Sequence, residues 1–345
     1  MSTDIKTLSP DLLKEQLVDA GFPAFRAKQV RDWLNKGVRS FDEMGNLPKE
    51  LRAHLAAHYV IGGVTIAKKW ESALDETVKY LFKLADGETV ESVLMKYKHG
   101  WSQCLSTQVG CRMGCAFCAT GMGGLVRNLT ASEMLSQIEA AQQDRGIRVS
   151  SIVLMGMGEP LDNFDEVMTF LTELGKEGGV CIGMRHVSLS TCGLVDKIER
   201  LMEHRSQLTL SVSLHAPNNE IRNRMMPVNR RWPVEQLLDA CRRYTEVTGR
   251  RISFEYAMMA GVNDSDACAE ELADRLRGML CHVNLIPANA VEGKSHRASS
   301  RMRLQAFCDI LKKKGINVTV RRTLGSDIEA SCGQLRRQAD RERGQ

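Results

Sequence analysis

The stretch QVGCRMGCAFC, residues 108–118, decides how the rest of the chain is interpreted. It holds three cysteines, Cys111, Cys115 and Cys118, separated first by three residues and then by two. Glycines surround them, at Gly110, Gly114, Gly121, Gly123 and Gly124. Because glycine has no side chain, such a loop can wrap closely around a bound group and direct its amides at it. The stretch therefore predicts a loop that holds a metal centre through three thiolates.

The number of thiolates indicates which metal centre this is. Iron–sulfur proteins that only carry electrons hold their cluster through four thiolates. Three thiolates leave one iron open, as a catalytic metal keeps an open position for its substrate. This combination resembles the radical S-adenosylmethionine superfamily, which implies a 4Fe-4S cluster whose open iron binds the amino and carboxylate groups of S-adenosylmethionine, so that electron transfer cleaves a carbon–sulfur bond. The alternative is a structural zinc with Cys104 as fourth ligand, in an RNA-binding protein without catalysis.

Strand-like and helical segments alternate around and after this loop. The strand-like runs lie at residues 104–108, 152–155, 187–190, 208–214, 252–258 and 283–286. The helical patterns begin with a capping box at residues 130–133 and continue at 164–176, 194–204, 234–248 and 265–277. Six such units predict an α/β fold, a partial or full (β/α)6 barrel, with active-site residues at the carboxyl ends of the strands. A last helix and a strand at 318–320 precede a charged tail.

The residues before the barrel have two other patterns. Helix signals dominate residues 1–60, where Ser9-Pro10 starts one helix, a second begins near Phe25 and a third follows Pro48. Residues 61–100 change to a period of two, with a turn at Asp86-Gly87 between strands at 78–84 and 90–95. We expect a small all-helical RNA-binding domain over 1–60, a β-hairpin extension over 61–100, and the barrel with its tail over 101–345.

Composition limits the remaining possibilities. Hydrophobic residues make up 43% of the 345 residues, enough for a packed core, and no apolar run reaches the ~20 residues of a membrane span. The polar N-terminus has no secretory signal, so we expect a cytoplasmic protein that does not bind membranes. In that compartment the 11 cysteines are metal ligands, catalytic thiols or small buried residues rather than a disulfide framework.

The positive charge gathers in the second half of the chain. Residues 294–322 hold nine lysines and arginines and one acid, and residues 221–251 hold eight arginines and three acids. A basic face of this kind suits a polyanion such as RNA, and Arg321 and Arg322 are the best candidates for RNA contact. The alternative is a set of ordinary solvated helix faces.

Short runs along nearly the whole chain resemble the RlmN/Cfr family of radical S-adenosylmethionine RNA adenine methyltransferases, and its RlmN members more closely. Besides QVGC at 108–111, they are RNLT (127–130), MGMGEP (155–160), SLHAPN (213–218), FEY (254–256), GVND (261–264), ASCGQL (330–335), FRAKQV (25–30) and NLP (46–48). The cysteine in the run STCG, 190–193, is a small variation on the family pattern.

The resemblance implies the reaction and three catalytic residues. RlmN proteins methylate carbon 2 of an adenosine in 23S ribosomal RNA and of the adenosine beside the tRNA anticodon, whereas Cfr proteins methylate carbon 8 and confer antibiotic resistance. Cys332 matches the cysteine that carries the methyl group and forms a covalent intermediate with RNA. Cys104 matches the resolving cysteine, which releases the product through a transient disulfide, and Glu91 matches the general base. Two S-adenosylmethionine molecules are consumed per turnover.

The resemblance also implies contacts with the cofactor. Glu159 would accept hydrogen bonds from the methionine ammonium. The full set of implied contacts is Gly158, Glu159, Ser190, Ser213, Leu214, His215 and Asn289. An electron donor such as flavodoxin and a monomeric state are also expected. Without the resemblance, the residues alone would make Cys332 a buried helix cysteine, Glu91 a solvent-facing strand residue and His215 a loop histidine. The other cysteines, Cys181, Cys192, Cys241, Cys268, Cys281 and Cys308, are expected to be small buried residues.

Overall fold

The computed structural model describes residues 3–38, 40–176, 179–289, 291 and 296–337. Lys294 of the basic segment and residues 338–345 of the expected tail lie outside the described residues. Among the helices that are described, none is long and apolar enough to cross a membrane.

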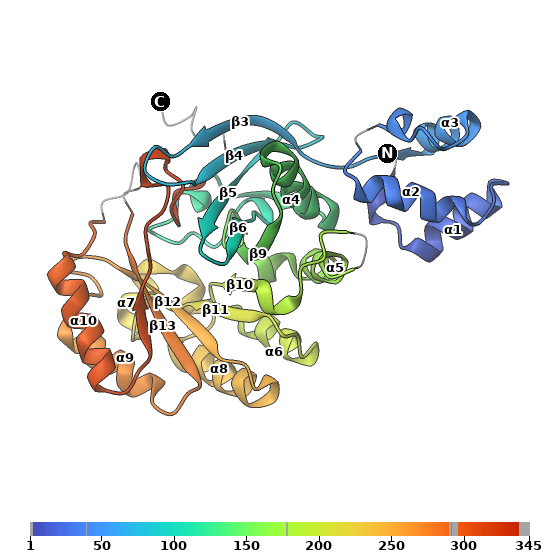
Figure 1. Ribbon diagram of the computed structural model, residues 1–345. Helices are drawn as coiled ribbons and strands as arrows, with labels where there is room; N and C mark the ends of the chain where they lie inside the picture. Colours follow the sequence, from blue (N-terminus) through green and yellow to red (C-terminus); the bar gives the residue numbers. More distant parts are fainter. Residues whose placement is uncertain (1–2, 39, 177–178, 290, 292–295, 338–345) are drawn as a thin grey trace.

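Three helices form the N-terminal part of the chain, as the sequence predicts. They are α1 (Pro10–Asp19), α2 (Arg26–Asn35) and α3 (Lys49–His58). The Ser9 side chain caps α1 by accepting a hydrogen bond from the main-chain N–H of Leu12. The helices bury a hydrophobic core of their own and stand beside the larger sheet (Figure 1). The sequence did not predict the short parallel pair of β1 (Thr3–Asp4) and β2 (Tyr59–Val60), which joins the two ends of this part.

A ten-stranded sheet forms the centre of the remaining chain. Its order is β14-β13-β12-β11-β10-β9-β6-β5-β4-β3. The strands are β3 (Thr65–Glu71), β4 (Val78–Lys83), β5 (Thr89–Tyr97), β6 (Gly100–Cys104), β9 (Val149–Leu154), β10 (Val187–Thr191), β11 (Thr209–Ser213), β12 (Ile252–Met258), β13 (Cys281–Pro287) and β14 (Val318–Val320). Strands β6 and β9 to β14 run parallel, whereas β3, β4 and β5 are antiparallel. The sheet curls into a partial barrel that stays open between β3 and β14 (Figure 1).

Helices follow the first six parallel strands and cover the outside of the barrel (Figure 1). They are α4 (Ala131–Arg145), α5 (Phe164–Leu174), α6 (Val195–Glu203), α8 (Val234–Thr248), α9 (Asp266–Leu276) and α10 (Arg301–Lys313). The predicted capping box is present, because Thr130 and Glu133 each accept from the other's main-chain N–H at the start of α4. The six β/α units are therefore confirmed. A short additional helix, α7 (Asn219–Met225), was missed.

The predicted first strand at residues 104–108 is wrong. Strand β6 ends at Cys104, and Gln108–Gly110 forms β7, which pairs with β8 (Leu125–Asn128) in a separate two-stranded sheet. Between β6 and β7 the chain runs beside the end of β9 and the residues after it. The main-chain N–H of Leu105 donates to the carbonyl of Val153, and the N–H of Thr107 donates to the carbonyl of Met157. Residues 104–108 therefore have the sequence of a strand, but the chain leaves the large sheet there and pairs with β8 from Gln108 onward. This change of partner positions β7, and the cysteine stretch after it, beside the end of β9.

Candidate active site

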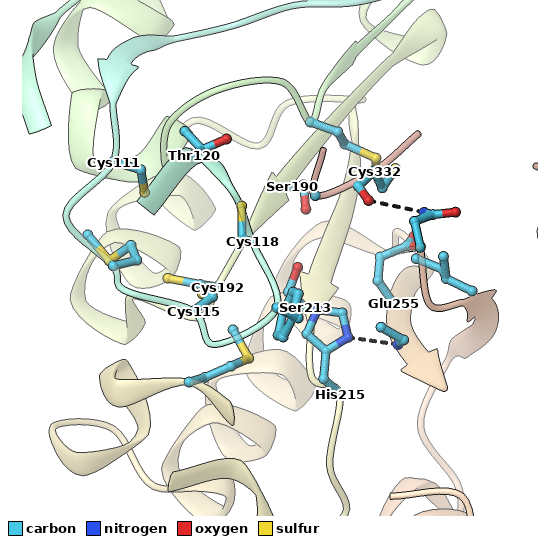
Figure 2. A pocket seen from close by; sticks show the side chains of 18 of the residues that line it. Cys111, Cys115, Cys118, Thr120, Ser190, Cys192, Ser213, His215, Glu255 and Cys332 are labelled. Carbon is cyan, nitrogen blue, oxygen red and sulfur yellow. Dashed lines mark hydrogen bonds between the residues drawn. The ribbon is translucent and has the colours of Figure 1, made fainter. Parts of the chain in front are cut away.

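A pocket of about 1010 Å³, its open mouth included, lies at the carboxyl ends of the parallel strands. Ten of the predicted site residues line it: Cys111, Cys115, Cys118, Gly158, Glu159, Ser190, Ser213, His215, Asn289 and Cys332. Figure 2 shows the three clustered cysteines on one wall and Cys332 facing them from the other side. Three predicted residues, Leu214, Cys104 and Glu91, do not line it.

The cysteine loop is shaped by its own main chain. The N–H of Cys111 donates to the carbonyl of Gly124 over 2.9 Å, and the N–H of Cys118 donates to the carbonyl of Cys115 over 3.2 Å. Gly110 has a φ of +81°, and a Cβ there would collide with the Gly124 carbonyl oxygen. A glycine is therefore required at this position for the loop to close.

The donor set fits an iron–sulfur cluster. Within the described ranges, no three histidine, cysteine or acidic side chains are grouped tightly enough to hold a single metal ion. Burial raises the pKa of Cys111 to about 12 and also raises the pKa of Cys115, so both thiols need nearby positive charge to ionise. Iron supplies that charge, and three thiols on one loop match a cluster with an open iron. Cys104, the fourth ligand that the zinc alternative names, does not line this pocket.

Glu159 is placed to meet a cation at the end of β9. Its Oε2 accepts from the N–H of Cys192 over 2.7 Å, and its Oε1 accepts from the N–H of Leu161 over 3.1 Å. Burial raises the pKa of the carboxyl above its ordinary value, although these hydrogen bonds oppose the shift. An ammonium group in the pocket would therefore favour the ionised form. The preceding Gly158 has a φ of +105°, and a Cβ there would lie 2.6 Å from the Gln108 Cβ.

His215 follows β11 in a strained conformation, with a φ of +57°. Its Nδ1 accepts from the main-chain N–H of Ala257 over 2.9 Å, so the neutral ring carries its proton on Nε2. Burial, with a smaller effect from Arg222, lowers the pKa of His215 to about 3, and the ring is therefore neutral at physiological pH. Phe117 of the cysteine loop packs against it edge to face, with 4.7 Å between the ring centroids. Leu214 is fully buried, so only its main chain is available near the pocket.

Cys332 reaches the pocket because its segment is hydrogen-bonded to the cysteine loop. The N–H of Ala119 donates to the Gly333 carbonyl over 2.8 Å, and the Thr120 hydroxyl donates to the Leu335 carbonyl over 2.6 Å. Asn289 donates its side-chain amide to the Cys332 carbonyl over 3.1 Å. The fold thus brings together two cysteine sites that are more than 200 residues apart in sequence.

Cys104 is buried at the end of β6 and does not line the pocket. Burial raises the pKa of its thiol to about 12, the charge of Cys332 adds to that shift, and Arg321 opposes it. Cys104, Cys332 and Arg321 are therefore close enough to act on one another electrostatically. Arg321 lines the pocket, with Nη1 3.6 Å from Glu255 Oε2, and the neighbouring Arg322 is exposed, so contact of either residue with RNA stays a prediction.

Glu91 is fully buried on β5, so the solvent-facing alternative is wrong. Its Oε2 accepts from the N–H of Arg336 over 2.9 Å, and its Oε1 lies 3.8 Å from Lys79 Nζ. The carboxylate therefore sits under the segment that follows Cys332, beside the pocket rather than on its lining.

Cys192 and Glu255 line the pocket but were not assigned to the site from the sequence, and Arg321 was assigned only to contact with RNA. Cys192 was expected to be a small buried residue, and it is buried, whereas the same prediction is wrong for Cys181, which is exposed. Glu255 lies near the end of β12 and Arg321 directly follows β14, so the rule that barrel sites gather at strand ends could have found both.

Comparison with known proteins identifies the family. The profile of the radical SAM superfamily matches residues 105–276, and that of the ribosomal RNA large subunit methyltransferase N-terminal domain matches residues 3–61. The chain is 52% identical to the probable dual-specificity RNA methyltransferase RlmN of Alkaliphilus oremlandii, over 97% of both chains. It is 50% identical to the protein of the same description from Clostridium tetani, over 96% of this chain and 95% of that one.

A solved structure agrees with these sequence matches. The crystal structure of a radical SAM methyltransferase from Sphaerobacter thermophilus superimposes with a TM-score of 0.92 at 46% identity, covering 97% of this chain and 99% of that one. The similarity therefore extends through the N-terminal helices, the barrel and the Cys332 segment alike. The chain accordingly belongs to the RlmN family of radical S-adenosylmethionine methyltransferases.

Proposed function

We propose that this protein is a dual-specificity RNA methyltransferase that methylates carbon 2 of adenosine in 23S ribosomal RNA and beside the anticodon of tRNA. The observation that carries the proposal is the hydrogen bonding of the Cys332 segment to the cysteine loop, which puts a single thiol opposite three clustered ones in one pocket. The RlmN relatives, described as dual-specificity RNA methyltransferases, support the choice of substrates.

The family requires a 4Fe-4S cluster and S-adenosylmethionine. We assign the cluster to Cys111, Cys115 and Cys118, and the methionine ammonium to Glu159. Ser190, Ser213, the main chain of Leu214, His215 and Asn289 complete the cofactor contacts, and Gly158 leaves room for them. When bound, the cluster and cofactor supply the electron and the 5′-deoxyadenosyl radical that activate a methyl group which is otherwise inert.

Cys332 is the residue that carries the methyl group. Its thiolate takes a methyl from one S-adenosylmethionine, and a second molecule is consumed to activate that methyl by hydrogen abstraction. Addition to the adenine ring then links the Cys332 sulfur to RNA through one carbon. This route suits an electron-poor ring carbon, which does not attack a sulfonium methyl as a nucleophile.

Cys104 and Glu91 complete the cycle. One electron leaves the adduct radical, which the bound cluster would accept, and Glu91 takes the proton from the adduct carbon. The Cys104 thiolate then attacks the Cys332 sulfur, so that a disulfide forms, the carbon–sulfur bond breaks and the released carbon takes up a proton to become the methyl group. The electrostatic coupling between Cys104, Cys332 and Arg321 supports this pairing of the two thiols. For Glu91 to act, the adduct must come within hydrogen-bond reach of a carboxylate that now lies under the segment at Arg336.

The product decides between carbon 2 and carbon 8. Reconstituted protein, S-adenosylmethionine and a reductant should convert adenosine in both RNA substrates to 2-methyladenosine, detected by chromatography and mass spectrometry of digested nucleosides. Predominant 8-methyladenosine would reject the assignment in favour of Cfr chemistry. Such a result would leave the cysteine assignments standing, because both chemistries use the same thiols.

Replacing Glu91 by Gln tests the proposed base. The change keeps the size of the side chain but removes its basicity, so release of the RNA adduct should slow by about 10²–10⁴-fold. Iron content should not change, since Glu91 does not line the pocket. Glu76→Gln, at an exposed carboxylate just before the neighbouring strand β4, is the control and should turn over normally. Normal turnover of Glu91→Gln would mean that Glu91 has only a structural role.

The remaining partners follow from these substrates. Because ribosomal RNA and tRNA are in the cytoplasm, we place the protein there. A small electron-transfer protein such as flavodoxin supplies the electrons, and the protein works as a monomer. The N-terminal helices over 1–60 contribute to RNA binding, the residues 61–100 extend the barrel, and the segment 101–345 carries the chemistry.

A further inference from the structure

Arg222 is a fully buried cation that the proposed chemistry does not use. It lies on α7, the helix that the sequence analysis missed. Taking a guanidinium out of water is unfavourable unless its donors are satisfied, and an apolar residue could fill the same space. Its presence therefore calls for an explanation in terms of what it contacts.

Its donors meet four neutral oxygens, three of them at the ends of two barrel strands. Nη2 donates to the carbonyl of Cys192 over 2.6 Å, just past β10, and to the carbonyl of Ser213 over 3.1 Å, the last residue of β11. Nε donates to the carbonyl of Leu214 over 3.0 Å, and Nη1 donates to Asn229 Oδ1, also over 3.0 Å. One rigid group thus fixes the spacing of two neighbouring strand ends.

Those two strand ends carry a large part of the proposed cofactor contacts. Ser190 and Ser213 lie at them, and His215 follows directly. The Cys192 N–H, next to the carbonyl that Arg222 holds, donates to Glu159. A shift of either strand end would therefore move the groups assigned to the methionine part of the cofactor.

The helix that carries Arg222 also holds the cysteine loop. The carbonyl of Met225, the last residue of α7, accepts from the N–H of Ala116 over 2.8 Å. Ala116 lies directly after Cys115, so the hydrogen bond falls within the cluster-binding stretch. A single turn of helix therefore connects the cluster ligands to the cofactor contacts.

The charge of Arg222 acts on the same groups. Burial lowers the pKa of Arg222, and Cys192 and Cys115 oppose that shift when ionised, so the guanidinium lies within electrostatic reach of a predicted cluster ligand. A guanidinium keeps its proton even when buried, because its ordinary pKa is far above neutral. A fixed positive charge beside a cluster stabilises the reduced form, which carries one more electron.

We propose that Arg222 is a positioning residue for the radical reaction, which locks the ends of β10 and β11 to the cluster loop and raises the reduction potential of the cluster through its charge. The inference rests on the proposed function, because that function places the cluster on Cys111, Cys115 and Cys118. The inference adds two separable effects of the Arg222 side chain: its planar guanidinium holds the two strand ends, and its charge raises the reduction potential of the cluster.

Two substitutions separate those effects. Arg222→Lys keeps the charge but loses the planar fork that reaches several carbonyls at once. Arg222→Met keeps the length of the side chain and loses both charge and donors. Arg224→Met is the matched control on the same helix, because Arg224 is exposed and pairs with Glu220, 3.6 Å away. Each protein is reconstituted anaerobically and compared with the parent chain.

Three measurements are made on each protein: iron per chain, the Kd for S-adenosylmethionine by equilibrium dialysis, and the reduction potential by redox titration followed by electron paramagnetic resonance. Arg222→Lys should bind the cofactor at least about tenfold more weakly at an unchanged potential, since it loses hydrogen bonds but not charge. Arg222→Met should bind it as weakly or more weakly, and its potential should be lower. Arg224→Met should match the parent in all three.

The outcomes separate this inference from the proposed function. A parent chain that holds no iron after reconstitution, or does not cleave S-adenosylmethionine, rejects the proposed function itself. A competent parent with an unchanged Kd in Arg222→Lys rejects the positioning role. An unchanged potential in Arg222→Met rejects the role of the charge. If Arg222→Met does not retain a cluster, the Kd of Arg222→Lys still decides the positioning role, and a lowered potential in that variant rejects the role of the charge.

Discussion

Replacing any one of Cys111, Cys115 or Cys118 by Ala should reduce the iron content of anaerobically reconstituted protein from near four per chain to below about one. Cleavage of S-adenosylmethionine should fall below detection in all three variants. The reason is that two thiolates cannot hold a cluster that needs three, and no further cysteine of the described residues stands on the same loop. Iron analysis, visible absorbance and the yield of 5′-deoxyadenosine measure the effect.

Cys192 provides a sharp control for this prediction. Its thiol lines the same pocket, is buried and hydrogen-bonds to Glu159, while the main-chain N–H of Cys192 makes a separate hydrogen bond to that carboxylate over 2.7 Å. Cys192→Ala therefore keeps that hydrogen bond and should keep the parent's iron content. Stoichiometric zinc and no visible absorbance in the parent protein would contradict the cluster assignment altogether. Loss of iron in Cys192→Ala would instead make Cys192 part of the ligand set.

The barrel was predictable because its strands and helices have strong local signals. The bounds of β12 and α8 are those the sequence predicts, since the alternation of large apolar residues along β12 and the amphipathic pattern of α8 are strong local signals. Strand β3 was missed because most of its residues are polar and exposed. Helix α7 was missed for a related reason, as seven residues with two apolar side chains give too little periodicity.

Burial of charged residues could not be predicted. Arg222 was counted with the basic residues of 221–251, and nothing in its neighbours distinguishes it from Arg224 on the surface. Glu91 lies opposite Val90 and Ser92 along β5, as alternation requires, yet all three are buried. A segment more than 240 residues later covers the second face of the strand, and such a contact leaves no mark in the local sequence.

The prediction of the catalytic residues rested on the resemblance to the family more than on any pattern in the sequence. Cys332 and Cys104 have no spacing that connects them, and only the fold brings the Cys332 segment to the cysteine loop. The three clustered cysteines, by contrast, indicate a metal centre from their spacing and their glycine-rich setting. The roles of Cys332 and Cys104 therefore need a direct test, and their two alanine variants should fail at different steps.

Cys332→Ala should form no methylated RNA, a loss of at least about a thousandfold, because it removes the only thiol assigned to carry the methyl group. Iron content should remain at the parent level, since Cys332 belongs to the segment opposite the three cluster ligands. Methylated nucleosides and iron, measured on the same preparation, separate this defect from the loss of the cluster.

Cys104→Ala should also release almost no product, but it should stop one step later. Cys332 is still present, so methylation and addition to RNA proceed, while the thiolate that breaks the adduct is missing. Protein covalently bound to RNA should therefore accumulate as a band of reduced mobility in denaturing gels, and ribonuclease should remove that shift. Cys181→Ala, at an exposed cysteine, is the control and should form product normally without the band. Free methylated RNA at the parent's yield from Cys104→Ala would refute the resolving role, because no buried thiol at the end of β6 would then be needed.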